Sequence, residues 1–301
     1  MKDFIRISED QILALGITPT KCVEWARDAF LHKDESILSP KISQKPTHDS
    51  FFNTMPCCLP RKNVMGVKVV SRLPGNVPPL KSTITLFDMT SGDLVALMDA
   101  NWITAMRTGA IAALAAKTFV NHFKEATFAF TGLGNISRAV LKCLLSQLDS
   151  SKVCDIWLLK FGDESKRFID DFKSCDWVRF HETADREELV SRSDALFSAV
   201  TVMNEQFLPP DKFPVGYTII PVHTKGFQDC DIVFDRIFGD DVDHERGFKN
   251  FDRFRFFAEF KDVLSGVVPG RQSAEERILC YNVGIALHDI WFATKICDMI
   301  G

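Results

Sequence analysis

The stretch that most constrains the fold of this chain is a short apolar run that leads into a glycine-rich loop. Residues 127–140 read TFAFTGLGNISRAV. The run FAF is typical of a buried parallel strand, and Gly132, Gly134 and Ser137 follow with the spacing GxGxxS before a helical pattern. The two glycines let the backbone turn tightly and approach a pyrophosphate, which the N-terminus of the next helix can bind. The third position is serine rather than glycine, so the loop alone leaves open a strand-to-helix turn without a ligand.

The segments after this loop alternate between strand and helix patterns. Short apolar runs separated by helices are typical of a doubly wound parallel sheet. The sequence therefore predicts an α/β protein with a Rossmann-type nucleotide-binding domain. A charged, irregular stretch over 240–252 and a final helix from Ala274 onward are expected after it. The expected strands are 154–159, 178–181, 195–200, 217–222 and 232–234, with helices over 164–172 and 186–191.

The segments before the loop have a different pattern, in which strands follow one another directly. Ser8 begins one helix as its N-cap, and Thr18 or Thr20 begins a second. Residues 37–60 are expected to be extended and irregular because four prolines interrupt them. Strand patterns over 65–71, 82–88 and 94–99 then predict an antiparallel sheet, and an alanine-rich helix is expected over 101–117.

Composition and charge exclude several classes of function. The formal net charge is -4 and no basic run is long enough to track a phosphate backbone, so no nucleic-acid partner is expected. No apolar run is long enough to span a membrane, and the charged N-terminal residues do not resemble a signal peptide. The nine cysteines lack the spacings of zinc sites. We therefore expect a cytoplasmic protein with reduced thiols and no metal site.

Two cationic residues stand out against apolar neighbours. Lys68 is flanked by valines in a predicted strand, where alternation allows it to point to solvent, the commoner arrangement for a lysine. If Lys68 points inward, desolvation lowers the pKa of its ammonium and makes it a proton donor or acceptor near neutral pH. Arg107 lies among small apolar residues of a helix, where it is expected to pair either with an acid of the protein or with a ligand carboxylate.

Eight short motifs follow one another along almost the whole chain. They are GVKVV from Gly66, the turn PGN that ends at Asn76, the threonine Thr83 that opens the next strand, TSG from Thr90, ITAMRTGA from Ile103, TGLGNIS from Thr131, GRQS from Gly270 and VGIALHD from Val283. In sequence and order they resemble the motifs of the ornithine cyclodeaminase and mu-crystallin family of NAD(P)-dependent enzymes. This agreement is far more specific than the glycine loop alone.

The resemblance implies a homodimer with two domains. Residues 1–120 and 275–301 would form a discontinuous α+β domain for substrate binding and dimerisation. Residues 121–274 would form the Rossmann domain that binds NAD(P).

The resemblance also implies roles for particular residues. Lys68 matches the lysine beside the substrate imine, where it hydrogen-bonds the substrate carboxylate or relays a proton. Arg107 matches the arginine that binds this carboxylate, Thr83 a threonine on the substrate side, and Thr108 a contact of the cofactor phosphate. The other cofactor contacts implied are Gly132, Gly134, Asn135, Ile136, Ser137, Thr201 and Val222.

Two departures from the family pattern affect the substrate. A second substrate-contacting arginine is expected in the irregular N-terminal stretch, but the nearest candidates are Lys41 and Lys45. Ornithine cyclodeaminases carry an aspartate after the fifth Rossmann strand, where this chain offers His223 or Lys225. A cation at this position would repel an ornithine ammonium, which argues against cyclodeamination.

A third departure concerns the cofactor. An acidic residue at the end of the second Rossmann strand favours NAD, but here this strand ends in Lys160. A lysine can neutralise a 2′-phosphate, so NADP(H) is favoured over NAD(H). A solvated Lys160 with no cofactor role is the alternative.

Together these features predict an NAD(P)H-dependent reductase that acts on the imine of a 2-oxo acid, of ketimine or Δ1-pyrroline-2-carboxylate type, or that oxidises the corresponding amino acid. Hydride transfer to an iminium carbon requires cations that fix the neighbouring carboxylate, and Lys68 and Arg107 have that chemistry. The alternatives are an ornithine or lysine cyclodeaminase and a non-catalytic, crystallin-like protein that binds NADP(H) or a small ligand.

Overall fold

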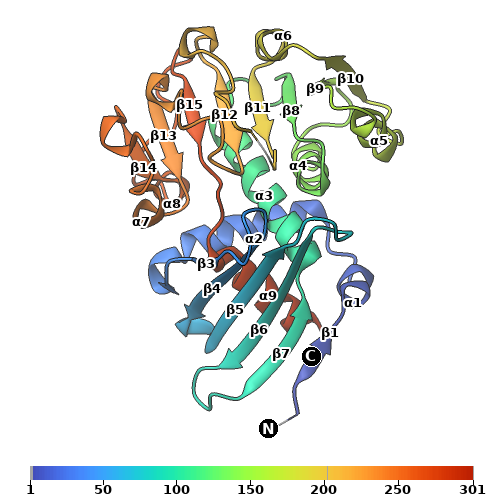
Figure 1. Ribbon diagram of the computed structural model, residues 1–301, viewed down its shortest axis with the longest axis vertical. Coiled ribbons are helices and arrows are strands. Elements are labelled where there is room, and N and C mark those ends of the chain that lie inside the picture. The colour runs from blue at the N-terminus through green and yellow to red at the C-terminus, as the bar shows by residue number, and fades with distance from the viewer. Residues whose placement is uncertain (1–2, 202, 301) are drawn as a thin grey trace. The chain divides into compact units, whose positions relative to one another are not determined.

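The computed structural model describes residues 3–201 and 203–300, and the chain divides into two compact units. The first unit ends at Arg107 and resumes at Gly284, and the second runs from Thr108 to Val283. From the sequence, the domain boundaries were predicted near residues 120 and 275. The first boundary instead lies inside helix α3 (Asn101–Phe119), because this single helix continues from one unit into the other. Figure 1 labels the elements along the chain.

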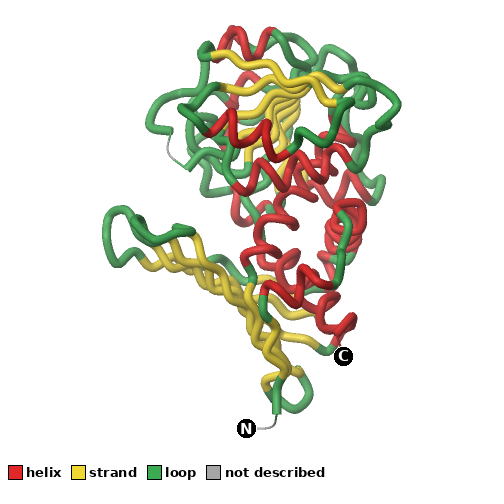
Figure 2. Tube along the Cα trace, turned by 90° about the vertical axis from the view of Figure 1, so that its right-hand side faces the viewer, coloured by secondary structure: helices red, strands yellow, loops and turns green. Residues whose placement is uncertain are grey.

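The first unit contains a seven-stranded sheet with the order β1-β7-β6-β5-β4-β2, in which β3 also pairs with β4. The pairings among β4, β5, β6 and β7 are antiparallel, whereas β1 runs parallel to β7. Figure 2 shows the helices of this unit on one side of the sheet. The strands are β1 (Ile5–Ile7), β2 (Ile37–Leu38), β3 (Ile42–Gln44), β4 (Phe51–Leu59), β5 (Val64–Arg72), β6 (Leu80–Asp88) and β7 (Leu94–Asp99), and the helices that lie wholly in this unit are α1 (Glu9–Ala14), α2 (Pro19–Leu31) and α9 (Ala286–Ile300).

Both predicted N-caps of the first two helices are confirmed. The Ser8 hydroxyl accepts a hydrogen bond from the Gln11 backbone N–H, and the Gln11 side chain accepts one from the Ser8 N–H. This reciprocal arrangement satisfies two N–H groups that a helix start otherwise leaves open. Thr18 caps α2 by accepting from the Lys21 N–H, and Pro19 occupies the first turn, where its missing N–H has no effect.

Residues 37–60 were predicted to be extended and irregular; the extended backbone is confirmed, but the irregularity is wrong for the nine-residue strand β4. A proline inside a strand removes one ladder hydrogen bond, which normally argues against a central position. Pro56 is tolerated because, on one side of β4, the partner strand changes from β3 to β2 at this position. β3 pairs with residues 52–54 of β4, and β2 pairs with Cys57 and Cys58, so the position of Pro56 falls between the two ladders.

Helix α9 covers one face of the sheet and contacts β4, β5 and β6. Gly66 in β5 is required by this packing, because a Cβ atom there would lie 2.5 Å from the side chain of Ile290. Side chains alternate along a strand, so Lys68, two residues further on, points to the same covered face as Gly66. The solvent-facing arrangement that is commoner for a strand lysine is therefore not the one found.

The second unit contains an eight-stranded sheet with the order β10-β9-β8-β11-β12-β15-β13-β14, and the strand pairings of the described residues in it are parallel. This confirms the predicted Rossmann-type sheet. The strands are β8 (Phe128–Thr131), β9 (Cys154–Leu159), β10 (Val178–Thr183), β11 (Ala195–Ser198), β12 (Thr218–Pro221), β13 (Arg236–Gly239), β14 (Phe257–Glu259) and β15 (Ile278–Cys280), and the helices include α4 (Asn135–Leu145), α5 (Glu164–Asp171), α6 (Arg186–Ser191), α7 (Val242–Glu245) and α8 (Phe260–Leu264).

Two predictions near the end of this unit were wrong. The strand expected over 232–234 is a 3-10 turn at Asp231–Val233, and the strand β13 begins at Arg236. The final helix does not begin near Ala274, since residues 278–280 form β15 and α9 begins at Ala286. A three-residue buried strand has no alternation of polar and apolar residues, so periodicity does not separate it from a buried helix.

No helix among the described residues is long and apolar enough to cross a membrane.

Candidate active site

In the first unit, three charged side chains meet on the face of the sheet that α9 covers. The Lys68 ammonium donates a hydrogen bond of 2.8 Å to Asp289 Oδ1, and Arg107 Nε donates one of 3.1 Å to the same oxygen. Lys68 is 1 % exposed, Asp289 0 % and Arg107 7 %. The other carboxylate oxygen, Asp289 Oδ2, is buried and has no hydrogen-bond partner in the described chain.

Three elements bring these groups together. Lys68 comes from β5, Arg107 from α3 and Asp289 from α9. Gly284 makes room for the guanidinium, because a Cβ atom there would overlap the Arg107 Nη1 atom. Its φ of +85° also lies in the left-handed region that favours glycine.

The electrostatics of this cluster favour an anionic ligand. Burial lowers the pKa of Lys68 to about 8, although the Asp289 carboxylate opposes that shift. Burial by itself would raise the pKa of Asp289, but the charges of Arg107 and Lys68 hold it below its ordinary value. Two cations therefore share one carboxylate, and the excess positive charge suits a ligand carboxylate.

The neighbours of the cluster include a histidine and a further lysine. Burial, together with the Arg107 charge, lowers the pKa of His288 to about 3, so this buried imidazole is neutral at physiological pH. Lys41 precedes β3, and the pKa of its ammonium is lowered first by desolvation and then by the charge of Arg107. Lys41 is thus the candidate in the N-terminal stretch whose charge interacts with the cluster.

The structure does not bring Thr83 to Lys68. Lys68 pairs with Ile84 of β6, whereas Thr83 pairs with Val69, and both of these residues are exposed on the opposite face. The hydroxyl on the Lys68 face belongs to Ser82, which is buried and accepts a hydrogen bond of 3.0 Å from Thr104. The substrate role of Thr83 stays a prediction, and this geometry does not favour it.

Sequence reasoning missed Asp289. The residue lies in the quoted motif VGIALHD, but no role was assigned to it. A signal was present, because Asp289 is an acid on a strongly apolar helix that also contains Trp291 and Phe292, and a buried acid needs a cationic partner.

In the second unit, the glycine loop has the geometry of a nucleotide-binding turn. Gly132 has a φ of +76°, and a Cβ atom there would lie 2.5 Å from the Ala199 carbonyl oxygen, so the protein itself requires glycine. Ser137 is fully buried and its hydroxyl donates to the Gly132 carbonyl. The serine that departs from the usual pattern therefore tethers the loop to the first turns of α4.

Gly134 differs from Gly132, because neither its backbone nor its surroundings require glycine. Its φ is -83°, and no atom lies within 4 Å of the place where a Cβ would be. Gly134 is the N-cap of α4 and provides no side-chain cap for the helix N–H groups. This open space and the helix start without a side-chain cap leave room for a ligand at the backbone, as a pyrophosphate requires.

The remaining predicted contacts occupy two places in the second unit. Thr108 is buried in α3, next to Gly109, where a Cβ would overlap the backbone of Ala139 in α4. Lys160 follows β9, where its backbone N–H donates 2.7 Å to the Thr183 carbonyl and its side chain is exposed. In the described chain, no carboxylate forms an ion pair with Lys160.

Four further predicted residues gather at the ends of β11 and β12. The Val222 N–H donates 2.9 Å to the Ser198 carbonyl, and His223 Nε2 lies in hydrogen-bond contact, 2.7 Å, with the Ser198 hydroxyl. The Lys225 ammonium donates 2.7 Å to the Thr201 carbonyl. Burial, followed by the Lys225 charge, lowers the pKa of His223 to about 4, so His223 is neutral and only Lys225 is a cation here.

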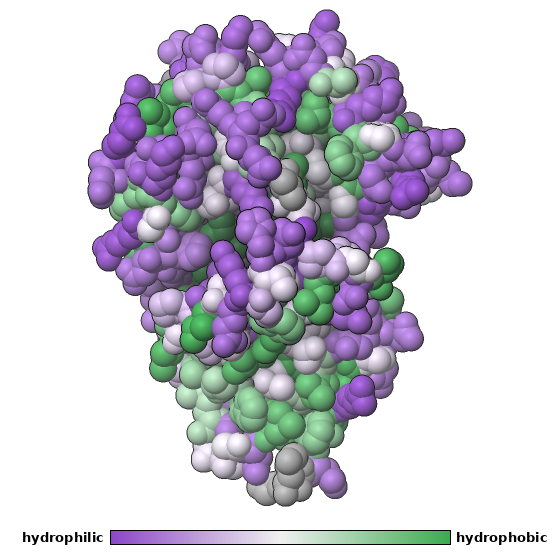
Figure 3. Space-filling model, viewed as in Figure 1, coloured by the Kyte–Doolittle hydropathy of each residue, from purple (hydrophilic) through white to green (hydrophobic). Residues whose placement is uncertain are grey.

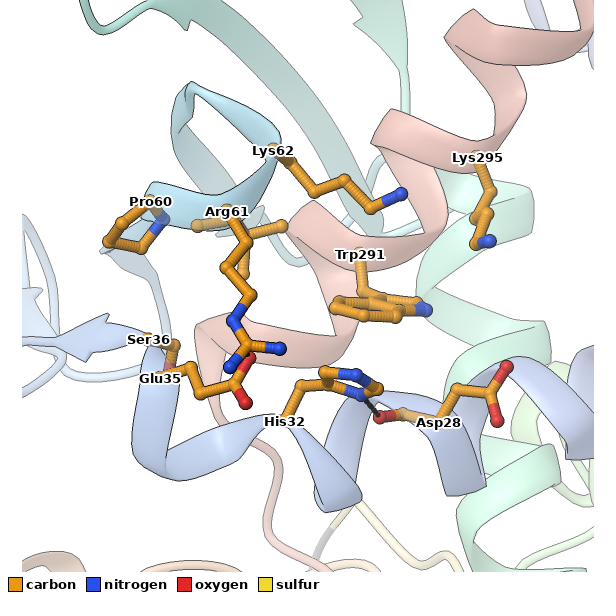
Figure 4. Close-up of a pocket in the computed structure, with 10 residues that line it drawn as sticks. Asp28, His32, Glu35, Ser36, Pro60, Arg61, Lys62, Trp291 and Lys295 are labelled. Carbon is orange, nitrogen blue, oxygen red and sulfur yellow. Dashed lines mark hydrogen bonds and ion pairs between the residues drawn. The ribbon is translucent and has the colours of Figure 1, made fainter.

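A separate pocket of about 350 Å³ lies in the first unit and contains none of the predicted site residues. Figure 4 shows its aromatic wall, where the rings of His32 and Trp291 lie 5.1 Å apart, and the ion pair of 2.9 Å between Arg61 and Glu35 at its edge. The described residues contain no group of three or more His, Cys, Asp or Glu side chains that could hold a metal ion.

Comparisons with known proteins agree on one family. Its model, described as the ornithine cyclodeaminase/mu-crystallin family, matches residues 18–301. The chain is 25% identical over 272 residues to the nodulation efficiency protein NfeD of Rhizobium meliloti, covering 86% of this chain and 83% of that protein. It is also 25% identical over 293 residues to the Δ1-pyrroline-2-carboxylate reductase of Colwellia psychrerythraea, covering 90% of each chain.

Two solved structures show the same fold. The Δ1-pyrroline-2-carboxylate reductase of Thermococcus litoralis, in complex with NADH and L-proline, aligns with a TM-score of 0.83 at 21% identity, covering 98% of this chain and 97% of that one. An archaeal alanine dehydrogenase dimer with bound NAD aligns with a TM-score of 0.84 at 19% identity, covering 98% of this chain and 95% of that one.

Proposed function

The chain belongs to the ornithine cyclodeaminase/mu-crystallin family, and from this premise we propose that it is an NAD(P)H-dependent reductase of the imines of 2-oxo acids. The same chemistry in reverse oxidises the corresponding amino acid. The observation that carries the proposal is the buried cluster of Lys68, Arg107 and Asp289, whose excess positive charge suits the carboxylate of such a substrate. The similarity to a pyrroline-carboxylate reductase over 90% of each chain supports the same reaction class.

The residues of the second unit fit a nicotinamide cofactor. The open space at Gly134 and the uncapped start of α4 would receive its pyrophosphate, and Gly132, Asn135, Ile136 and Ser137 complete the loop. The cofactor, when bound, supplies the hydride. In this proposal the second unit binds the nucleotide and the first unit binds the substrate.

The residues of the first unit bind and orient the substrate. In this proposal the Arg107 guanidinium keeps Nε bound to Asp289 and binds the substrate carboxylate through its Nη groups. Reduction of a neutral imine also requires one proton at nitrogen. Lys68, with a pKa of about 8, is largely protonated at neutral pH and holds that proton in a buried position.

Lys160 supports a preference for NADP(H). Its ammonium is exposed at the end of β9, where Rossmann proteins contact the adenosine ribose. Because no carboxylate of the described residues forms an ion pair with Lys160, the ammonium can bind a phosphate on that ribose. The change Lys160→Ala is expected to raise the KM for NADPH roughly tenfold or more and to leave the KM for NADH unchanged. Equal effects on both cofactors would contradict the assignment.

We also propose that the protein is a homodimer, formed through the sheet face opposite α9. Figure 3 shows hydrophobic residues gathered over the strands of this face. It includes Val69, which is 38% exposed, and Val95, which is 39% exposed, with the partly exposed Val67 and Leu97. The structurally similar archaeal alanine dehydrogenase is a dimer.

The decisive experiment is an absorbance assay at the band of the reduced nicotinamide, with NADPH and NADH, against a panel of cyclic and linear imines made from 2-oxo acids. Oxidation of the cofactor by an imine is the expected result, and Lys68→Met is expected to abolish it while nucleotide binding persists. Ammonia release from ornithine with a catalytic amount of NAD would show a cyclodeaminase instead. Nucleotide binding without turnover of any substrate would show a non-catalytic binder.

A further inference from the structure

The sheet face that carries Lys68 extends beyond the catalytic cluster and carries two more polar groups. Lys68 of β5 pairs with Met55 of β4, and the next residues on the same face are Val70, which pairs with Asn53, and then Arg72. Because side chains alternate, Asn53 and Arg72 share the face of Lys68. Both carry a buried atom without a hydrogen-bond partner in the described chain, namely Asn53 Oδ1 and Arg72 Nε.

Arg72 is bound by a backbone carbonyl and not, within the described residues, by an acidic side chain. Its Nη1 donates 2.9 Å to the backbone carbonyl of Asp49, and no ion pair joins Arg72 to a carboxylate of the described residues. A buried donor on a charged group is expensive to leave unpaired, so a site with this geometry favours an acceptor brought by a ligand. The planar guanidinium, with Nε and one Nη on the same edge, matches a carboxylate.

Asn53 can complete the same subsite. Its amide has an acceptor end and a donor end, and the two ends exchange by a flip of the side chain. It lies opposite Val70, between Lys68 and Arg72 along the sheet. An anion bound by Arg72 therefore has an amide donor within reach on the neighbouring strand.

We propose that the substrate carries a second carboxylate at the end of its side chain, and that Arg72 and Asn53 bind this group while Arg107 binds the first. The proposal rests on the proposed function and names its substrate class, the imines of 2-oxo diacids. The Cα atoms of Lys68 and Arg72 are four residues apart on one strand, or about 13 Å. We expect the substrate to span the distance that remains between the Lys68 cluster and the long side chain of Arg72.

The first experiment compares pairs of linear imines of equal chain length, made from 2-oxoglutarate or 2-oxopentanoate and from 2-oxoadipate or 2-oxohexanoate, each with methylamine. In the pair whose chain length is reduced more efficiently, we expect kcat/KM to be at least about tenfold higher for the diacid imine than for the monoacid imine. The change Arg72→Gln is expected to remove this preference by raising the KM for the diacid roughly 10- to 100-fold, with the monoacid unaffected.

Three variants separate a binding role from a structural one. Asn53→Asp keeps the shape of the side chain and the bond from Arg72 to Asp49, but places a negative charge beside Arg72, so the diacid preference is expected to fall here too. Arg72→Lys is expected to restore part of it. Arg61→Gln is the matched control, because Arg61 is another arginine of the first unit that pairs with Glu35 at the separate pocket of Figure 4. Arg61→Gln is expected to leave the preference for the diacid unchanged.

Binding without catalysis gives an independent measurement. Glutarate, an unreactive diacid, is expected to raise the melting temperature of the wild-type protein and not that of Arg72→Gln, whereas butyrate has little effect on either. Equal rates for diacid and monoacid imines, or equal losses for both in Arg72→Gln, would overturn the inference and leave imine reduction intact. If no imine of either kind is reduced, the proposed function itself fails.

Discussion

Asp289 controls the protonation of Lys68, because among the residues that the structure describes its carboxylate is the one acid hydrogen-bonded to that buried ammonium. In the proposed function Lys68 must carry its proton to serve as a donor, so activity is expected to be present below its pKa of about 8 and to be lost as the pH rises through that value. The charged groups that act on Lys68 are Asp289, Arg107 and Lys41. Of these, only Asp289 raises its pKa.

The change Asp289→Asn is therefore expected to move the alkaline loss of kcat/KM to lower pH by about one unit or more, because the carboxylate no longer opposes the desolvation of Lys68. The measurement is kcat/KM for imine reduction between about pH 6 and 9. A lower rate at every pH with an unchanged alkaline limb would show that Asp289 only supports the structure. Asp289→Glu, which keeps the charge, is expected to restore the position of the limb in part.

Two of the three residues in the charged cluster could be predicted from the sequence, and the third could not. Lys68 and Arg107 could be proposed because an isolated cation among apolar residues needs an explanation and the family motifs supply one. Their shared partner could not be identified, since Asp289 lies 221 residues from Lys68 and no spacing rule connects them. Thr83 shows the opposite problem, because a one-residue difference along a strand moves a side chain to the other face of the sheet.

At the scale of elements, the turn between β8 and α4 contains two glycines that are needed for different reasons. Gly132 is required by a φ of +76° and by the close Ala199 carbonyl, whereas Gly134 faces open space. Gly132→Ala is expected to destabilise folding by about 2 kcal/mol or more. Gly134→Ala is expected to change stability by less than about 0.5 kcal/mol and yet to weaken NADPH binding, because the added methyl occupies the proposed pyrophosphate position.

Thermal or urea unfolding, combined with fluorescence titration of NADPH, measures both effects in the same samples. Gly134→Ala with wild-type affinity for both nucleotides would contradict the proposed position of the pyrophosphate. The two variants, Gly132→Ala and Gly134→Ala, control for each other, because both add one methyl group to the same loop.

Elements with a strong local pattern were predictable, and elements that depend on neighbours were not. Helix α3 and strands β5, β6 and β7 follow directly from alanine content, alternation and turn residues. β4 was missed because Pro56 is acceptable only where the ladder passes from β3 to β2, a fact of tertiary pairing. β15 was missed because three buried residues carry no periodicity.

At the scale of the whole molecule, the proposed dimer makes a prediction about Val69. A glutamate on the exposed sheet face would place a charge inside an apolar interface, where burial without a partner is unfavourable. Val69→Glu is expected to give a monomer in size-exclusion chromatography with light scattering, while the wild type gives a dimer. The control is Val267→Glu, at a residue of the second unit that is 76% exposed and lies outside the sheet of the first unit. A monomeric wild-type protein would rule out the proposal.

The discontinuous first unit has a consequence for the order in which the molecule can be completed during synthesis. The strand that carries Lys68 emerges from the ribosome long before α9, which supplies both the cover of that sheet face and the carboxylate of Asp289. Until α9 has been made, the Lys68 ammonium lacks the carboxylate of Asp289 and this face of the sheet lacks its covering helix. The second unit, by contrast, is one uninterrupted segment whose strands are all available earlier. The nucleotide-binding unit can therefore fold while the first unit still lacks α9.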